Sequence, residues 1–325
     1  MADAVPKTRR IWLAWLSGIV LVIVVGIVIA RRGEELRFAD LLQHARPGWL
    51  LAAALLQIGT YACAAGAWQR VLARQGIKTS LWQLIPLGLA KLFMDQVVPS
   101  AGLSGTLLVV RALERRGVPD RASASAVVVG LLGFHLAYGL ALVTALALLA
   151  ISGDLSRRML SLAILAALLI GAMVVALLWL ARGRRGPVRR FLIRIPGLKA
   201  FLQGLHDAPK EALHDKMLLL QTTLLQFGIF VLDSATLGVC LAALGATASV
   251  TGLFAALVIA SLVATITVIP SGLGTFDATM LAMLHLVGVS KTNGVGAVLL
   301  FRGFTLMLPL LPGLWLARRE TKAKA

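Results

Sequence analysis

Long apolar runs alternate with short polar segments along most of the chain. Six of these runs are about 20 residues long or longer, the length that a helix needs to cross the hydrocarbon core of a bilayer. They predict membrane spans over residues 12–30, 49–69, 123–151, 159–181, 217–244 and 295–317. The pattern therefore predicts an all-α, polytopic integral membrane protein that forms a single transmembrane domain over residues 1–325.

Two further apolar runs are interrupted by proline and glycine. The first run covers residues 81–98, breaks over 99–105 and continues to 113; the second covers 253–269, breaks over 270–274 and returns over 275–287. Proline removes a backbone donor and glycine weakens a helix, so each break leaves polar backbone groups that hydrocarbon cannot satisfy. Such breaks persist at membrane depth only where protein buries them or a wet cavity reaches them. We therefore expect two re-entrant hairpins.

The two breaks carry a short internal repeat. Pro99-Ser100 matches Pro270-Ser271, and after a gap of one residue Gly102-Leu103 matches Gly272-Leu273. With the N-terminus inside and each hairpin returning to its own side, 22 lysines and arginines lie on the cytoplasmic side and 7 outside. This bias agrees with the positive-inside rule and predicts cytoplasmic N- and C-termini. The hairpins then enter from opposite faces, which is typical of inverted-repeat transporters with a substrate site between the tips.

Composition and charge fit the same class of protein. The chain is 59% hydrophobic and carries a net charge of +18, and its basic residues lie between the apolar runs, where anionic headgroups would meet them. We therefore expect no nucleic-acid partner. Residues 182–216 form a basic segment between the halves, interpreted either as a solvated cytoplasmic linker or as a lipid-recruiting surface. Cys63 and Cys240 lie inside apolar runs without metal-ligand spacing and indicate no metal site or cofactor.

Six ionisable residues fall within the apolar segments, and their formal charges sum to zero: Lys91, Arg111, Arg302, Asp95, Asp233 and Asp277. A charge facing lipid at the centre of a helix costs about 2.5–3.5 kcal/mol or more, so these side chains should face inward and meet partners. One interpretation is a set of structural ion pairs that hold the bundle together. Lys91 and Asp95 are four residues apart, which favours a pair within one helix.

The other interpretation is a binding site for a phosphate headgroup. Guanidinium groups of Arg111 and Arg302 suit a phosphate better than lysine does. Backbone N–H groups at the breaks would add neutral contacts, and the residues that place them are Ser100, Gly102, Ser271, Gly272 and Gly274. Asp277 follows the second break near the start of the returning helix, where the helix dipole favours an anion. Asp233 either neutralises Arg302 or carries protons.

The sequence contains no arrangement that is typical of a catalyst. No Ser/His/Asp order, HExxH helix, Walker loop or dinucleotide fingerprint is present. His135 and Tyr138 lie one turn apart within an apolar run, where a hydrogen-bonded core role is common. We therefore expect a protein that is not an enzyme.

Three stretches together resemble the lysylphosphatidylglycerol synthase transmembrane family: the first break followed by Arg111, residues 268–277, and residues 300–314 of the last span. The family's Pro-Gly-Gly-Leu-Gly…Glu pattern corresponds to Pro270, Gly272, Leu273, Gly274 and Asp277, with aspartate where glutamate is usual. A glycine-glutamate before the arginine of the first motif is replaced here by Ser104-Gly105-Thr106. The resemblance implies a flippase-like membrane protein without the soluble domain that performs aminoacyl transfer.

From these features the sequence predicts a protein of the bacterial inner membrane that translocates or exposes an anionic or modified phospholipid between leaflets. The alternative is a non-transporting accessory or scaffold subunit of a phospholipid or hopanoid synthesis complex. A membrane-embedded lipid-modifying enzyme fits less well because catalytic motifs are missing. The expected partners are membrane lipids, with lipid-synthesis enzymes or a second copy of the chain as further possibilities.

Overall fold

The computed structural model describes residues 46–97, 103–151, 215–267 and 272–322, together with residues 164, 168, 171, 172 and 175. All regular secondary structure in these residues is helical, which confirms the all-α class. Within the described part, four helices are long and apolar enough to cross a membrane: 47–74, 120–151, 216–243 and 291–316. Four of the six predicted spans are therefore helices. The span predicted at 12–30, the span predicted at 159–181 apart from residues 164, 168, 171, 172 and 175, and the basic segment up to residue 214 lie outside the described residues.

The same order of helices occurs twice. The first series is α3 (Pro47–Arg74), α4 (Leu81–Val97), α5 (Leu103–Arg115) and α6 (Asp120–Ile151), with 28, 17, 13 and 32 residues. The second begins with α11 (Lys216–Ala243), α12 (Val250–Thr267) and α13 (Thr275–Leu286), with 28, 18 and 12 residues. It ends in a continuous run of α14 (Lys291–Arg302), the π-helical turn η2 (Gly303–Met307) and α15 (Leu308–Lys322). The last run thus corresponds to α6.

Matching glycines end the corresponding helices. Gly76, Gly117, Gly245 and Gly288 all have φ between 73° and 87°, and they follow α3, α5, α11 and α13. After each one, the next residue donates its N–H to a carbonyl five residues back, as in Val118 to Leu113 and Val289 to Leu284. Glycine adopts this left-handed conformation without a side-chain penalty, and the motif satisfies carbonyls that a helix end leaves free. The two series are therefore stopped by the same local chemistry.

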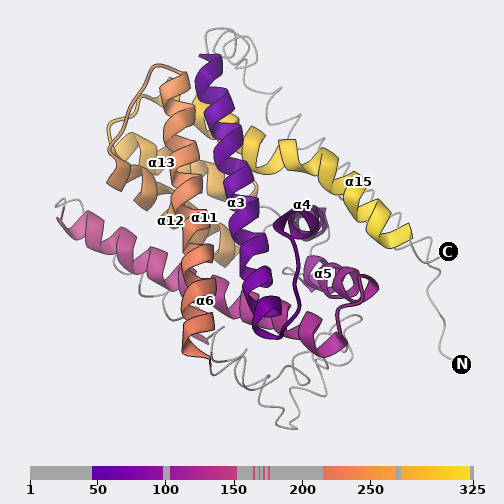
Figure 1. Cartoon of the computed structure of the whole chain (residues 1–325). Helices are drawn as coiled ribbons and strands as arrows, with labels where there is room; N and C mark the ends of the chain where they lie inside the picture. Colours follow the sequence, from indigo (N-terminus) through magenta and orange to yellow (C-terminus); the bar gives the residue numbers. More distant parts are fainter. Residues whose placement is uncertain are drawn as a thin grey trace, which may run out of the picture.

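The central helices α3 and α11 lie side by side and run antiparallel (Figure 1). At one end Arg74 Nε lies 3.1 Å from Asp215 Oδ2, and at the other Arg46 N donates to Ala243 O over 3.3 Å. The two helices share the pattern Leu-Leu-Gln-x-Gly, at residues 55–59 and 224–228. Both glycines sit at the interface, since an added Cβ would lie 3.2 Å from Leu232 at Gly59 and 3.4 Å from Cys63 at Gly228. The contact is thus approximately two-fold symmetric.

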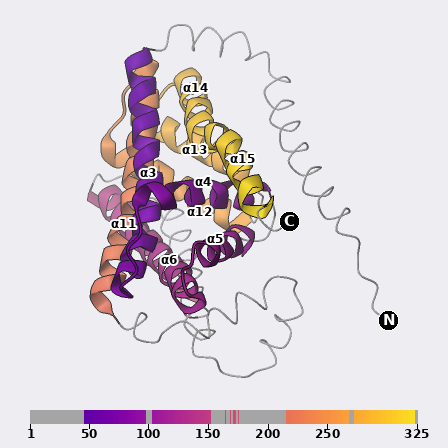
Figure 2. The ribbon, with the colours of Figure 1, turned by 45° about the vertical axis from the view of Figure 1, so that its right-hand side comes forward.

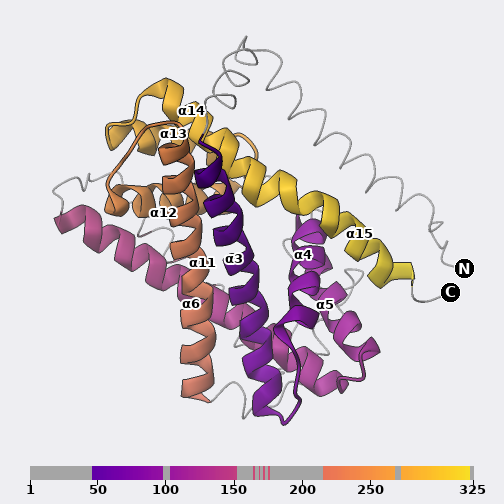
Figure 3. The same ribbon diagram turned by 45° about the horizontal axis from the view of Figure 1, so that its top comes forward.

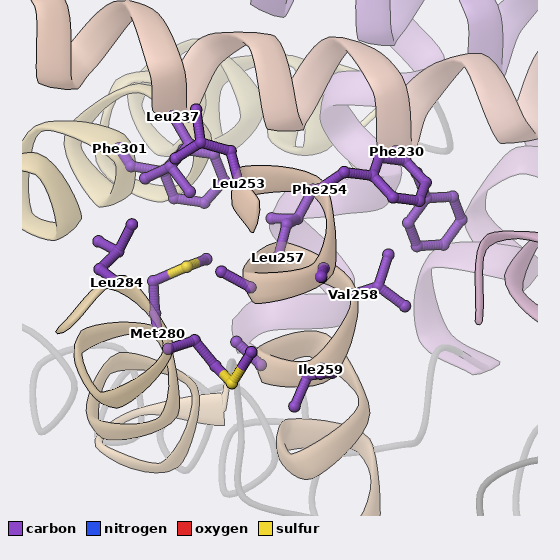
Figure 4. Packing of buried hydrophobic residues seen from close by; sticks show 14 of the residues in the cluster. Phe230, Leu237, Leu253, Phe254, Leu257, Val258, Ile259, Met280, Leu284 and Phe301 are labelled. Atoms are coloured by element: carbon purple, nitrogen blue, oxygen red, sulfur yellow. The ribbon is translucent and has the colours of Figure 1, made fainter. Parts of the chain in front are cut away.

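The two larger hydrophobic clusters of the described residues lie one around each broken helix pair. One cluster joins α3, α4 and α5 with the first half of α6, and it includes Leu72, Leu87 and Leu113. The other joins α11, α12, α13 and α14 with the second half of α6; Figure 4 shows Phe254 and Met280 among its members. Helix α6 therefore runs from one cluster to the other.

The run of α14, η2 and α15 connects the second series of helices back to the first. Its first part, α14, packs in the second cluster, whereas α15 crosses α4 of the first series (Figures 2 and 3). The approach is close because Gly313 has no side chain: an added Cβ would lie 2.9 Å from Leu89 O and 2.8 Å from Phe93 Cβ. Helix α6 ends the first series and packs on α12 of the second, and α15 ends the second series and packs on α4 of the first.

Candidate functional site

The second break is built by two glycines and one aspartate at the start of α13. Gly272 and Gly274 have φ of 60° and 81°, which side-chain-bearing residues rarely adopt. Asp277 Oδ2 accepts the N–H of Gly274 over 3.0 Å, so the carboxylate sits where the first turn of the helix presents free donors. This position agrees with the predicted preference for an anion after the break.

Arg302 ties this break to the last helical run. Its Nε donates to Asp277 Oδ1 over 2.6 Å, and its Nη2 lies 3.4 Å from the carbonyl oxygen of Gly272. The guanidinium carbon also lies 4.2 Å from the centre of the Phe276 ring, within cation–π range. The side chains of Arg302 and Asp277 are 13% and 28% exposed, so this ion pair is partly shielded. The second break is therefore charge-balanced and bound to a residue 25 positions away.

Aromatic packing and a π-helical turn on either side of Arg302 orient its side chain toward the second break. The rings of Phe276 and Phe301 stack with centroids 6.1 Å apart, so the residue before Arg302 packs on the residue before Asp277. Directly after Arg302, α14 changes into the π-helical turn η2. Such turns insert an extra residue into a helix and are frequent at functional sites.

The first break is held by a different arrangement around a comparable glycine. Lys91 Nζ lies 2.6 Å from Asp95 Oδ2, which confirms the predicted pair within one helix. The other oxygen of Asp95 accepts the N–H of Gly105 over 3.0 Å, so α4 supplies the cap for α5. The approach requires glycine, because an added Cβ at Gly105 would lie 2.6 Å from Lys91 O.

The remaining predicted site residues are dispersed. Arg111 lies on the exposed face of α5 and forms no ion pair or hydrogen bond within the described part of the chain, so it is not drawn into the Arg302 pair. Ser100, Gly102 and Ser271 lie outside the described residues.

Asp233 lies in the α3–α11 interface and not in the Arg302 ion pair. Its Oδ1 accepts from Gln57 Nε2 over 2.9 Å, and Gln57 Nε2 also lies 3.1 Å from Thr236 Oγ1. Gln57 is 3% exposed and was not among the residues that the sequence suggested. The sequence does carry a signal for Gln57, since an uncharged amide within an apolar run is also costly to leave without a partner.

The arrangement therefore consists of two aspartate-capped helix breaks, each neutralised by one cation, and a separate amide–carboxylate contact between α3 and α11. A guanidinium that already binds a carboxylate and a carbonyl oxygen has the donor geometry to bind phosphate oxygens instead. The capped breaks supply the backbone donors that such an exchange would expose.

Comparison with known proteins yields one family. Residues 15–313 match the model of the lysylphosphatidylglycerol synthase transmembrane region. No curated protein matches the chain.

Proposed function

The chain belongs to the family of lysylphosphatidylglycerol synthase transmembrane regions, a membership that indicates a membrane-lipid-related role. From it and from the two charged breaks we propose that the protein moves or exposes an anionic or modified phospholipid between leaflets. The observation that carries the proposal is the Arg302–Asp277 pair at the break before α13, because a partly shielded ion pair at interrupted backbone supplies both a guanidinium and a capped backbone N–H that a phosphate could take over. The protein acts by binding and releasing, without a covalent step.

The proposed architecture has two re-entrant hairpins, α4–α5 and α12–α13, entering from opposite faces of the membrane. The antiparallel contact of α3 with α11 supports it, because corresponding helices that run in opposite directions carry their hairpins in opposite directions. The lipid headgroup would lie between the breaks while the acyl chains stay in the bilayer. We place the protein in the bacterial inner membrane with both termini in the cytoplasm.

Arg302 would bind the headgroup phosphate by exchanging partners. In the structure, Nε and Nη2 bind Asp277 and Gly272, and a phosphate offers oxygen acceptors in place of the carbonyl oxygen. The hydrogen bond to Gly272 is the longer of the two, so it should exchange first. Asp277 would remain near the guanidinium and limit how tightly the anion is held, which favours release.

The test is translocation of labelled phosphatidylglycerol in proteoliposomes that contain the wild type, Arg302→Lys or Arg302→Ala. We expect wild-type movement, a reduced rate with Arg302→Lys, which retains charge without the fork, and loss with Arg302→Ala. Arg111→Ala is the matched control for removal of an arginine, and unfolding measurements on each variant check that the fold persists. Equal rates in folded wild type and both Arg302 variants would contradict the site. No translocation of any tested lipid by the wild type would favour an accessory role.

A further inference from the structure

The carboxylate of Asp233 differs from the two at the helix breaks, because it has no counter-charge among the described residues. Asp95 pairs with Lys91 and Asp277 pairs with Arg302, whereas Asp233 forms no ion pair in the part of the chain that the structure describes. It follows Lys216 by 17 positions in α11, so it lies about 26 Å from the start of this membrane helix. An ionised carboxylate without a counter-charge is strongly disfavoured inside a membrane helix.

The elements packed against α11 explain why this charge stays uncompensated. Helix α12 contains no ionisable residue, and from α6 the candidates are His135 and Tyr138. From α14 come Lys291 and Arg302, and Arg302 is engaged at the second break. Helix α3 contributes Cys63, which packs on Gly228, and Tyr61, which lies one turn after Gln57. The buried Tyr61 hydroxyl has no hydrogen-bond partner among the described residues. Within the described ranges the carboxylate is bound by the neutral Gln57 amide and by no cation.

The internal repeat indicates that the fold does not require this carboxylate. Through the Leu-Leu-Gln-x-Gly pattern Gln57 corresponds to Gln226, and the same alignment places Ala64 at the position of Asp233. Gln226 is also buried, and its side chain makes no hydrogen bond within the described residues. One half of the interface therefore has alanine where the other half has aspartate.

We propose that Asp233 is a proton-binding site and that its protonation is coupled to lipid movement; the coupling rests on the proposed function. Uptake forms an O–H bond on the carboxylate with a proton from water on one side and removes the charge between α3 and α11. Release returns that proton to water on the other side. Gln57 binds the carboxyl group in both forms because its amide can donate to a carboxylate or to the C=O of the acid.

The proton site is tested without lipid transport by infrared difference spectra of the full-length protein between acidic and alkaline buffer. We expect a carboxylic-acid C=O band that disappears in Asp233→Asn, remains in the control Asp277→Asn, shifts in Gln57→Leu and is unchanged in the matched variant Gln226→Leu. A band that persists unaltered in Asp233→Asn would overturn the assignment.

The coupling is tested with labelled phosphatidylglycerol in proteoliposomes under an imposed pH gradient. The wild-type rate should change severalfold with the gradient, whereas the Asp233→Asn rate should not respond. Equal gradient dependence in both proteins would overturn the coupling. If the wild type moves no lipid under any gradient, the proposed function fails, while the infrared result still decides whether Asp233 binds a proton.

Discussion

Both helix breaks are capped by an aspartate that pairs with a cation, but the cation is near in the sequence in one break and distant in the other. In both, an aspartate oxygen lies 3.0 Å from a glycine N–H, at Gly105 in the first break and at Gly274 in the second. In the first, the aspartate and its cation both come from α4 and lie one turn apart. In the second, the aspartate comes from the returning helix and its cation from α14. In the described residues the cap and the cation of the first break thus both come from α4, whereas the cation of the second break comes from another element.

This difference indicates which break can respond to the rest of the protein. A local pair within one helix moves with that helix, so its geometry persists when neighbouring elements shift. The Arg302 pair persists only while α14 and α13 keep their present distance, and it adjoins the π-helical turn. We therefore expect the second break to open and close with the last helical run, while the first stays rigid.

The largest effect should come from removing the remote cation. Arg302→Met removes the ion pair with Asp277, the hydrogen bond to Gly272 and the contact with the Phe276 ring, which together should lower the free energy of unfolding by about 3 kcal/mol. The measurement is reversible unfolding in mixed micelles. Adding Asp277→Asn removes the orphaned charge and should restore part of the loss. A loss in Arg302→Met below the experimental error would show that the pair does not stabilise the break.

A smaller effect is expected where the last run covers the first hairpin. Gly313→Ala places a methyl group 2.9 Å from Leu89 O and should lower the unfolding free energy by about 2 kcal/mol through overpacking. Gly303→Ala in the same run meets no atom within 4 Å and should be neutral or slightly stabilising. If both substitutions had the same effect, the close approach of α15 to α4 would be refuted.

A comparable test applies to the glycine of the first break. Gly105→Ala brings a methyl group to 2.6 Å from Lys91 O and crowds the Asp95 carboxylate, so a loss of about 1–2 kcal/mol is expected. Gly88→Ala in α4, with no atom within 4 Å, is the control. The measurement is again reversible unfolding in mixed micelles. An unchanged free energy of unfolding in Gly105→Ala would argue against the cap that Asp95 forms on the Gly105 N–H.

The smallest effect should come from removing the local cation. Lys91→Met removes a single ion pair at a side chain that is 32% exposed, while Asp95, which is 19% exposed, keeps the Gly105 N–H, so the expected loss is at most about 1 kcal/mol. The ratio of the losses in Arg302→Met and Lys91→Met measures the difference between the two breaks directly. Equal losses would mean that the local and the remote pair contribute alike.

Sequence patterns were sufficient where the determinants are local. The bounds of the broken helices agree with the structure to within a few residues, because proline, glycine and apolar length act over short distances. The Lys91–Asp95 pair was predicted for the same reason, since four-residue spacing fixes neighbours on a helix.

Partners that are distant in the chain were not predictable in this way. The sequence left Asp233 as a possible neutraliser of Arg302, whereas the structure pairs Arg302 with Asp277 and Asp233 with Gln57. The choice depends on how α3, α11 and α14 are rotated about their axes, which residue spacing does not determine. The cap that Asp95 gives to Gly105 was missed because it requires the exact path of the chain around the break.

The position of α15 across α4 has a consequence for biosynthesis. Helix α4 emerges from the ribosome long before α15, so the face of α4 around Leu89 and Phe93 enters the membrane without its final cover. Until translation reaches Gly313, that face must rest against lipid or against a membrane insertase or chaperone. Assembly of the N-terminal half is therefore completed only by the C-terminal end of the described chain.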